Sequence, residues 1–111
     1  MGDPTVVRPL VLGAGGLFGR SLSRLLEETW PATVSATRAE LDVTDRFRLE
    51  SEVERLQPTV VINCAAYSDP DGCEVDADRA RRVNVQGAEN AARAAAGAGC
   101  RIVQLSTVAV F

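Results

Sequence analysis

A glycine-rich segment near the amino terminus is the part of the sequence best suited to bind an anion. Residues 13–19 read Gly-Ala-Gly-Gly-Leu-Phe-Gly, which places Gly13, Gly16 and Gly19 in a G-x-x-G-x-x-G spacing. Glycines let a backbone approach a phosphate closely, and a helix that begins there presents free N–H groups to it. The segment follows an apolar run and precedes an amphipathic one, so the sequence predicts a dinucleotide pyrophosphate loop. A tight strand-to-helix turn without a ligand is the alternative.

The end of the second predicted strand decides which dinucleotide would fit. A ribose hydroxyl is usually held there by Asp or Glu, whereas a 2′-phosphate needs a cation. The sequence places Arg38 at this point and Glu40 two residues later. The Arg38 guanidinium can pair with a phosphate, which favours NADP. Glu40 could hold a ribose, which leaves NAD as the alternative.

Two further segments belong to the same predicted edge of a sheet. At Asp42-Val43 an adenine ring could lie beside an apolar residue and donate to a carboxylate. At residues 63–67, Asn-Cys-Ala-Ala-Tyr, small side chains leave room for the ribose and nicotinamide half of a cofactor. Either segment alone could be ordinary loop chemistry. Together with the glycine loop they predict one crevice at the carboxyl ends of parallel strands.

Alternating strand-like and helix-like segments must position these residues. The predicted strands cover Leu10–Leu12, residues 33–37, a stub at 41–43, residues 59–63 and the run from Arg101. The predicted helices cover residues 17–29, the stretch from a Thr44 cap to Pro58, and about 75–96, the first with Phe18, Leu22, Leu25 and Leu26 at helical spacing. Such alternation with short connections predicts an α/β fold with a doubly wound parallel sheet.

Composition narrows the class of protein. The 111 residues fit one domain, and the net charge of −3 argues against a nucleic-acid partner, because neutralising phosphates needs a basic excess. No apolar stretch approaches the roughly 18 residues of a membrane span. Three cysteines without a C-x-x-C pair, and no histidine, argue against a metal site and a disulfide framework. Reduced thiols favour the cytoplasm.

Five ordered motifs resemble a known family. GAGGLFG, ATRAELDVTD, VINCAAYSDPDGCE, RRVNVQGAENAARAA and LSTVAVF are similar to the extended short-chain dehydrogenases/reductases. Within them, the dTDP-4-dehydrorhamnose reductase group of sugar-nucleotide enzymes is the nearest match. The resemblance implies a Rossmann-like fold, NADP or NAD as cofactor, and hydride transfer to a nucleotide-linked 4-keto sugar.

The resemblance also implies roles for individual residues. The pyrophosphate loop would comprise Gly13, Gly16, Leu17, Phe18 and Gly19. The adenosine side would comprise Arg38, Asp42 and Val43, and the nicotinamide-ribose side Ala65, Ala66 and Tyr67. Thr107 would be the catalytic hydroxyl, which hydrogen-bonds the substrate carbonyl as charge develops on it. No metal ligand is implied.

The chain departs from the family pattern in two ways. The family uses a tyrosine and, four residues later, a lysine, whereas this chain has only Tyr67 and no lysine. We therefore expect residues 1–111 to be a truncated NAD(P)-binding domain of an oxidoreductase, without its substrate lobe and inactive alone. In addition, Val108-Ala109 replaces the Asp-Tyr of the reductase group.

That second departure keeps two other functions open. One is a nucleotide-sugar epimerase or dehydratase with tightly bound NAD, whose strand ends in a similar pattern. The other is a non-catalytic NADP-binding regulatory subunit, like that of methionine adenosyltransferase. The expected partners are a nucleotide-sugar substrate and a second copy of the chain in a homodimer.

Overall fold

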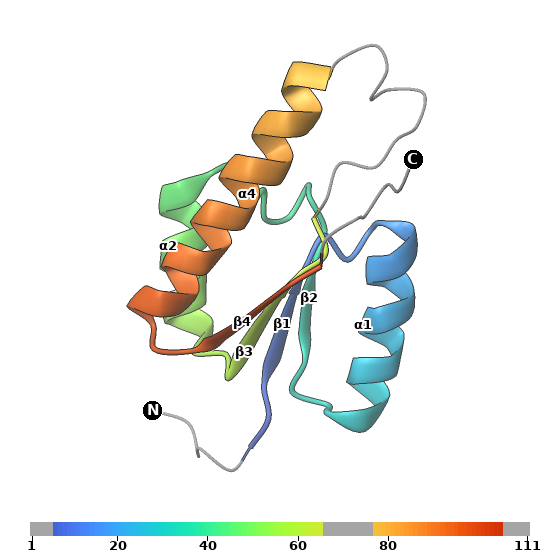
Figure 1. The fold of residues 1–111 in the computed structure, drawn as a ribbon. Coiled ribbons are helices and arrows are strands. Elements are labelled where there is room, and N and C mark those ends of the chain that lie inside the picture. Colours follow the sequence, from blue (N-terminus) through green and yellow to red (C-terminus); the bar gives the residue numbers. More distant parts are fainter. Residues whose placement is uncertain (1–5, 66–76, 106–111) are drawn as a thin grey trace.

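The computed structural model describes residues 6–65 and 77–105 of the chain. Strands and helices alternate throughout this part, as the sequence predicts. The elements are β1 (Pro9–Leu12), α1 (Leu17–Thr29), β2 (Val34–Ala36), α2 (Arg46–Leu56), β3 (Val60–Asn63), α4 (Ala77–Gly97) and β4 (Arg101–Gln104) (Figure 1).

The four strands form one parallel sheet in the order β2-β1-β3-β4. The last residue of β1, Leu12, lies between Ala36 of β2 and Asn63 of β3. The chain passes from β1 to β2 on one side and then crosses back to β3 on the other. The strand order therefore reverses beside β1, and the carboxyl ends of open parallel sheets bind ligands at such a reversal.

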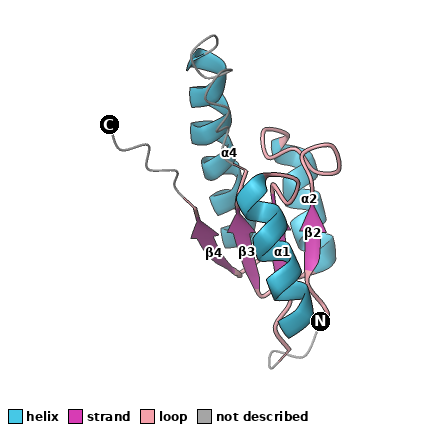
Figure 2. Ribbon diagram, turned by 90° about the vertical axis from the view of Figure 1, so that its right-hand side faces the viewer, coloured by secondary structure: helices cyan, strands magenta, loops and turns pink. Residues whose placement is uncertain are grey.

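Helices cover both faces of this sheet. Figure 1 and Figure 2 show α1 on one face and α2 beside α4 on the other. This confirms the predicted doubly wound α/β fold. The main hydrophobic core lies on the α2 and α4 side, where Leu10, Leu49 and Val53 are at most 1% exposed. Burying one such side chain contributes about 1.5–3 kcal/mol, so this layer supplies most of the apolar stabilisation.

The face that α1 turns to the sheet is only partly the one that its apolar spacing predicts, because Leu22 and Leu26 are half-buried whereas Phe18 and Leu25 are exposed. Phe18 and Leu25 are 60% and 61% exposed, whereas Gly19 and Ser23 are the buried residues of the helix. The reason lies in the preceding loop, because Gly19 packs against the carbonyl oxygen of Gly13. A small residue must face the sheet there, and Phe18 and Leu25 are turned outward.

The segment between β2 and α2 also differs from its prediction. Residues 41–43 form no strand, because the Leu41 N–H donates to the Thr37 carbonyl at 2.8 Å and the chain turns. The N-cap of α2 is Asp45, whose carboxylate accepts from the Arg48 N–H at 3.3 Å, and not Thr44. The Thr44 hydroxyl donates to Asp42 instead, at 2.8 Å.

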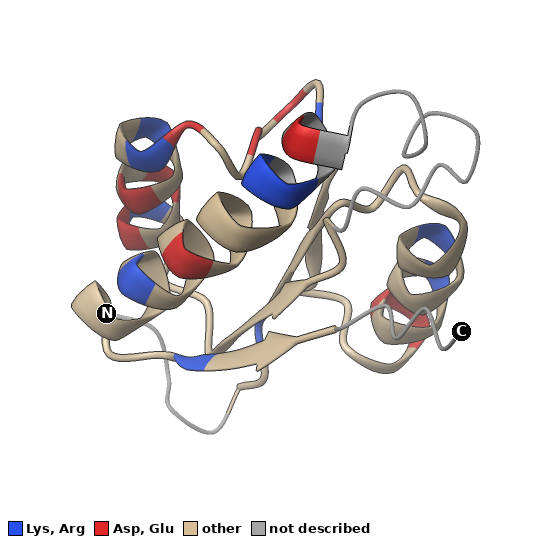
Figure 3. Ribbon diagram, turned by 45° about the horizontal axis from the view of Figure 1, so that its top comes forward, with Lys and Arg blue, Asp and Glu red and all other residues tan. Residues whose placement is uncertain are grey.

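Charged residues of both signs are interleaved along α2 and α4, as the blue and red segments of the ribbon show (Figure 3). Among the described residues, three ion pairs link side chains one turn apart within the same helix: Arg46–Glu50 and Arg55–Glu52 in α2, and Arg93–Glu89 in α4. Solvent screens such pairs, so they favour the helices only slightly. Among the described helices, none is both long enough and apolar enough to span a membrane.

Candidate functional site

The glycine loop and the first turn of α1 form a backbone cradle at the carboxyl edge of the sheet. Gly13 has a positive φ of 72°, and Gly16 is the N-cap of α1. The N-cap makes no side-chain hydrogen bond, and the first turn of α1 contains no acidic residue. The first N–H groups of the helix and the positive end of its dipole are therefore available to an anion, as the sequence predicts for a pyrophosphate.

Packing alone requires two glycines of this loop. A Cβ on Gly19 would collide with the carbonyl oxygen of Gly13, and a Cβ on Gly13 would lie 2.6 Å from the Cα and the N of Ala65. The corresponding nearest atoms are 3.5 Å away for Gly15 and 3.6 Å for Gly16, which is ordinary contact. Gly13 thus brings the loop after β1 directly against the loop after β3.

Three side chains surround the cradle on the α1 side. Leu17 and Phe18 project from the first turn with 89% and 60% of their surfaces exposed. Arg20, which the sequence analysis did not single out, donates from Nη2 to the Gly15 carbonyl at 3.2 Å. Its guanidinium therefore lies beside the loop as a second source of positive charge. A cation directly after the glycine segment was the available signal, and the first turn of α1 brings its guanidinium back to the Gly15 carbonyl.

The loop after β3 is held by a buried amide. Asn63 is 1% exposed; its Oδ1 accepts from the Ala65 N–H and its Nδ2 donates to Gln104 Oε1, both at 2.9 Å. Asn63 therefore joins the ends of β3 and β4 and fixes the residue that contacts Gly13. Cys64, between Asn63 and Ala65 in the chain, is half-buried. Burial raises the pKa of its thiol, which keeps the thiol neutral.

In the turn after β2, Arg38 is exposed and the Glu40 side chain is hydrogen-bonded to Thr37. The Thr37 N–H donates to Glu40 Oε1 at 2.9 Å, and the Glu40 N–H donates to Thr37 Oγ1 at 3.4 Å, in a reciprocal capping arrangement. The hydrogen bonds from Thr37 hold the pKa of the Glu40 carboxyl below its ordinary value. Arg38 is exposed in the same turn. Glu40 is exposed too, but its Oε1 is engaged by the Thr37 N–H, so the turn favours a phosphate at Arg38 over a ribose diol at Glu40.

This turn lies next to the glycine loop. The Ala14 N–H donates to the Ala36 carbonyl at 3.0 Å, across the ends of β1 and β2. A Cβ on Gly15 would contact Thr37 Cγ2 at 3.5 Å. The structure therefore brings together the loops that carry the predicted pyrophosphate and adenosine contacts.

Asp42 is an ordered, ionised acceptor. Its Oδ1 accepts from the N–H and the hydroxyl of Thr44, at 2.9 and 2.8 Å. Burial works to raise the pKa of Asp42, but these two hydrogen bonds and the charge of Arg38 outweigh it, so the pKa is lowered. The side chain of Val43 is only 3% exposed and joins the core. At Val43 the fold offers a ligand the main chain rather than the side chain.

Three predicted site residues, Ala66, Tyr67 and Thr107, lie outside the described residues. Their roles stay predictions. In residues 6–65 and 77–105, no group of three or more His, Cys, Asp or Glu side chains could hold a metal ion.

The chain matches a protein family over most of its length. The model of the family described as RmlD substrate binding domain matches residues 7–111. A dTDP-4-dehydrorhamnose reductase of Streptomyces griseus is 39% identical over 104 residues, which are 94% of this chain and 34% of that protein. The chain thus spans about a third of the length of these curated relatives.

A solved structure agrees with the fold. The crystal structure of dTDP-4-dehydrorhamnose reductase from Bacillus anthracis in complex with NADP superposes with a TM-score of 0.79 and 30% sequence identity. The superposed region covers 86% of this chain and 34% of the Bacillus anthracis chain. One further relative is not named as a reductase. Methionine adenosyltransferase 2 subunit beta of Xenopus laevis is 32% identical over 111 residues, which cover 94% of this chain and 33% of that protein.

Proposed function

Since the chain belongs to the RmlD substrate binding domain family, we propose that it is the NADP-binding part of a reductase. The enzyme would reduce the 4-keto group of a nucleotide-linked sugar. The relatives named dTDP-4-dehydrorhamnose reductase, and the one solved with NADP, support this proposal. The observation that carries it is the backbone contact between Gly13 and Ala65 beside the uncapped N-terminus of α1.

The pyrophosphate is proposed to bind over residues 13–19. Helix N–H groups there donate to its oxygens, and Leu17 and Phe18 contact the cofactor from the first helical turn. Gly13, Gly16 and Gly19 keep the backbone close enough for those bonds. Arg20, beside the loop, adds a positive charge.

The adenosine half is proposed to bind along the loops after β2. Arg38 would pair with the 2′-phosphate of NADP, because Glu40 is already engaged by Thr37. The Asp42 carboxylate would accept from the adenine amino group, beside the main chain of Val43. NAD would lack the phosphate that Arg38 recognises, so NADP is the proposed cofactor.

The nicotinamide half is proposed to lie at the loop formed by Ala65, Ala66 and Tyr67. When bound, the cofactor supplies the hydride that reduces the carbonyl. Thr107 would donate a hydrogen bond to the carbonyl oxygen as negative charge develops on it. The chain contains one tyrosine and no lysine, so we propose that residues 1–111 bind the cofactor without turning over the sugar.

Turnover by the protein as its gene encodes it tests this proposal. The purified protein is mixed with NADPH and a dTDP-linked 4-keto-6-deoxy sugar, and the loss of NADPH absorbance is followed. We expect oxidation that requires the sugar and that is faster with NADPH than with NADH. No sugar-dependent oxidation, with NADPH nevertheless bound, would contradict a reductase.

That last outcome would favour a second candidate, a non-catalytic NADP-binding regulatory subunit. The similarity to methionine adenosyltransferase 2 subunit beta and the Val108-Ala109 departure support it. An epimerase or dehydratase is distinguished in the same experiment, because its NAD would stay bound through purification and no added NADPH would be consumed.

The free thiols of Cys64 and Cys100 are in keeping with the cytoplasm as the proposed location. A homodimer is the proposed assembly, which sedimentation of the encoded protein tests.

A further inference from the structure

We propose that Asn90 is a positioning residue for the adenosine half of the cofactor. It extends from α4 and holds the loop that presents Asp42 and Val43. The inference rests on the proposed cofactor site, and it assigns a role to a residue that does not itself contact the cofactor. Its basis is a hydrogen bond between two parts of the chain that are 47 residues apart.

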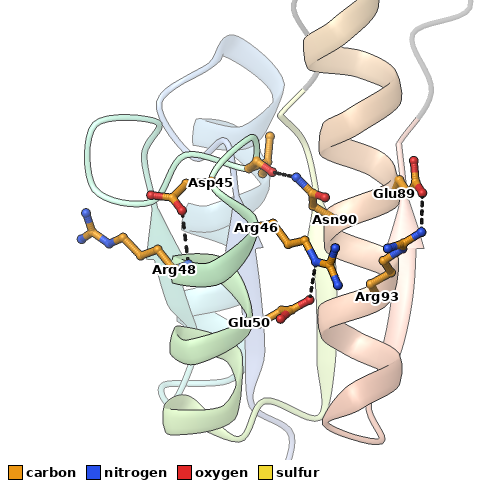
Figure 4. A network of polar contacts seen from close by, with 8 residues as sticks. Asp45, Arg46, Arg48, Glu50, Glu89, Asn90 and Arg93 are labelled. Carbon is orange, nitrogen blue, oxygen red and sulfur yellow. Dashed lines mark hydrogen bonds and ion pairs between the residues drawn. The ribbon is translucent and has the colours of Figure 1, made fainter.

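The hydrogen bond fixes one end of a peptide group. Asn90 Nδ2 donates to the carbonyl oxygen of Val43 at 2.9 Å, as the dashed line from Asn90 in Figure 4 shows. The N–H of the same peptide group belongs to Thr44, and it donates to Asp42 Oδ1 at 2.9 Å. In a trans peptide the carbonyl and the N–H point in opposite directions, and no described peptide bond is cis. Asn90 and Asp42 therefore hold one peptide group from its two sides.

Packing reinforces this contact. Gly87 lies three residues before Asn90, on the same side of α4. A Cβ on Gly87 would lie 2.6 Å from Val43 Cγ2, so the helix approaches the loop as closely as a glycine allows. The Val43 side chain is 3% exposed beneath it. The loop can thus move only if α4 moves with it or if both contacts break.

The consequence for the proposed site concerns Asp42. Within the described part of the chain, both hydrogen bonds to its carboxylate come from Thr44 and end on Oδ1, which leaves Oδ2 for the adenine amino group. If Asn90 were lost, the partly buried Val43 carbonyl would lose its donor. The peptide could then rotate and carry the Thr44 N–H away from Asp42. The glycine loop is held by other contacts and would keep its geometry.

The test compares ligands that carry different halves of the cofactor. Dissociation constants are measured for NADPH, for 2′,5′-ADP (the adenosine half) and for reduced nicotinamide mononucleotide. The encoded protein is compared with Asn90→Ala and Asn90→Asp, at a temperature where circular dichroism shows each to be folded. Glu89→Gln is the matched control, because it changes the adjacent exposed residue of α4, which pairs only with Arg93 in the described structure.

Asn90→Ala should raise the dissociation constants for NADPH and 2′,5′-ADP about fivefold to tenfold, which is the range expected for the loss of one net hydrogen bond. Asn90→Asp should weaken them at least as much, because an ionised carboxylate cannot donate to the Val43 carbonyl. Reduced nicotinamide mononucleotide should bind unchanged, and Glu89→Gln should alter none of the three. Unchanged 2′,5′-ADP affinity, or an equal loss for all three ligands, would overturn the proposal.

Gly87→Ala provides a second route to the same loop. The added methyl group displaces Val43 directly, so the same selective loss of 2′,5′-ADP affinity is expected with Asn90 intact. If Gly87→Ala binds 2′,5′-ADP normally, the proposed coupling of α4 to the loop is wrong. If the unsubstituted protein binds neither NADPH nor 2′,5′-ADP, the proposed function fails, and that result is separate from any difference between variants.

Discussion

Gly13 and Ala65 meet backbone to backbone: a Cβ on Gly13 would lie 2.6 Å from both the N and the Cα of Ala65. These residues follow β1 and β3, the neighbouring strands at which the order of the sheet reverses. The close approach joins the two loops that border the proposed cofactor crevice. The two loops are therefore already in contact through the fold itself.

Gly13→Ala should destabilise the protein and weaken NADPH binding. The left-handed φ costs an L-residue roughly 1–2 kcal/mol, and the clash with Ala65 adds to that cost. Gly97→Ala is the matched control, since no atom lies within 4 Å of its added Cβ. Its free energy of unfolding should stay equal or rise by up to about 1 kcal/mol. Urea unfolding measures both variants, and an equal response of the two would contradict the contact.

Arg38→Ala should change which cofactor the protein prefers. A hydrogen bond to a charged group contributes about 1.5–3 kcal/mol, so the dissociation constant for NADPH should rise about tenfold to hundredfold. The constant for NADH, which has no 2′-phosphate, should stay the same. Calorimetric titration of both cofactors measures the change. Arg24→Ala, which removes an exposed arginine of α1, should leave both constants unchanged; a similar loss there would indicate a nonspecific charge effect.

Asp42→Asn should make stability less sensitive to acid. The pKa of Asp42 is lower in the folded chain than in the unfolded one, so the ionised carboxylate stabilises the fold above its ordinary pKa of about 4. This stabilisation is lost as the pH falls from that value through the folded pKa. The difference in unfolding free energy between the natural protein and Asp42→Asn should thus be largest at neutral pH and should shrink below about pH 4. Urea unfolding across this range measures it, and a constant difference would argue against the Thr44 contacts.

Asp45→Ala and Thr44→Ala should have different effects. Asp45 caps α2, so its loss should cost about 0.5–2 kcal/mol of stability with little change in NADPH affinity. The Thr44 hydroxyl orients Asp42, so Thr44→Ala should weaken the binding of 2′,5′-ADP and lower the melting temperature less than Asp45→Ala does. Melting curves and ligand titrations on both variants separate the effects. If Thr44→Ala proved the more destabilising, Thr44 rather than Asp45 would be the cap.

Local sequence patterns predicted most of the fold. Helix α1 has the predicted bounds, and α2 and β3 begin and end within two residues of their predictions. Glycine spacing and proline positions mark such boundaries, because these residues act on their own backbone angles. The placement of Arg38, Asp42 and Ala65 at one edge also followed from the sequence, since parallel strands bring their carboxyl ends together.

Other features differed from the prediction or were missed, one through local hydrogen bonds and two through contacts between residues far apart in the chain. The predicted strand at residues 41–43 is a turn, because Thr37 and Thr44 offer hydrogen bonds that a sheet neighbour does not. The roles of Asn63 and Asn90 were not predicted, because their partners lie 41 and 47 residues away. The residues around each asparagine in the sequence do not indicate which distant residue it binds.

The sequence by itself determined the alternation of strands and helices, the glycine loop before α1 and the set of loops that meet beside it. These are consequences of periodicity and of backbone preferences within a few residues. Only the tertiary structure decided which part of the apolar face of α1 is buried, that Gly13 and Ala65 meet, and that Asn90 holds the Asp42 loop. Those features arise from contacts between segments, and a contact between segments exists only once the sheet has placed them side by side.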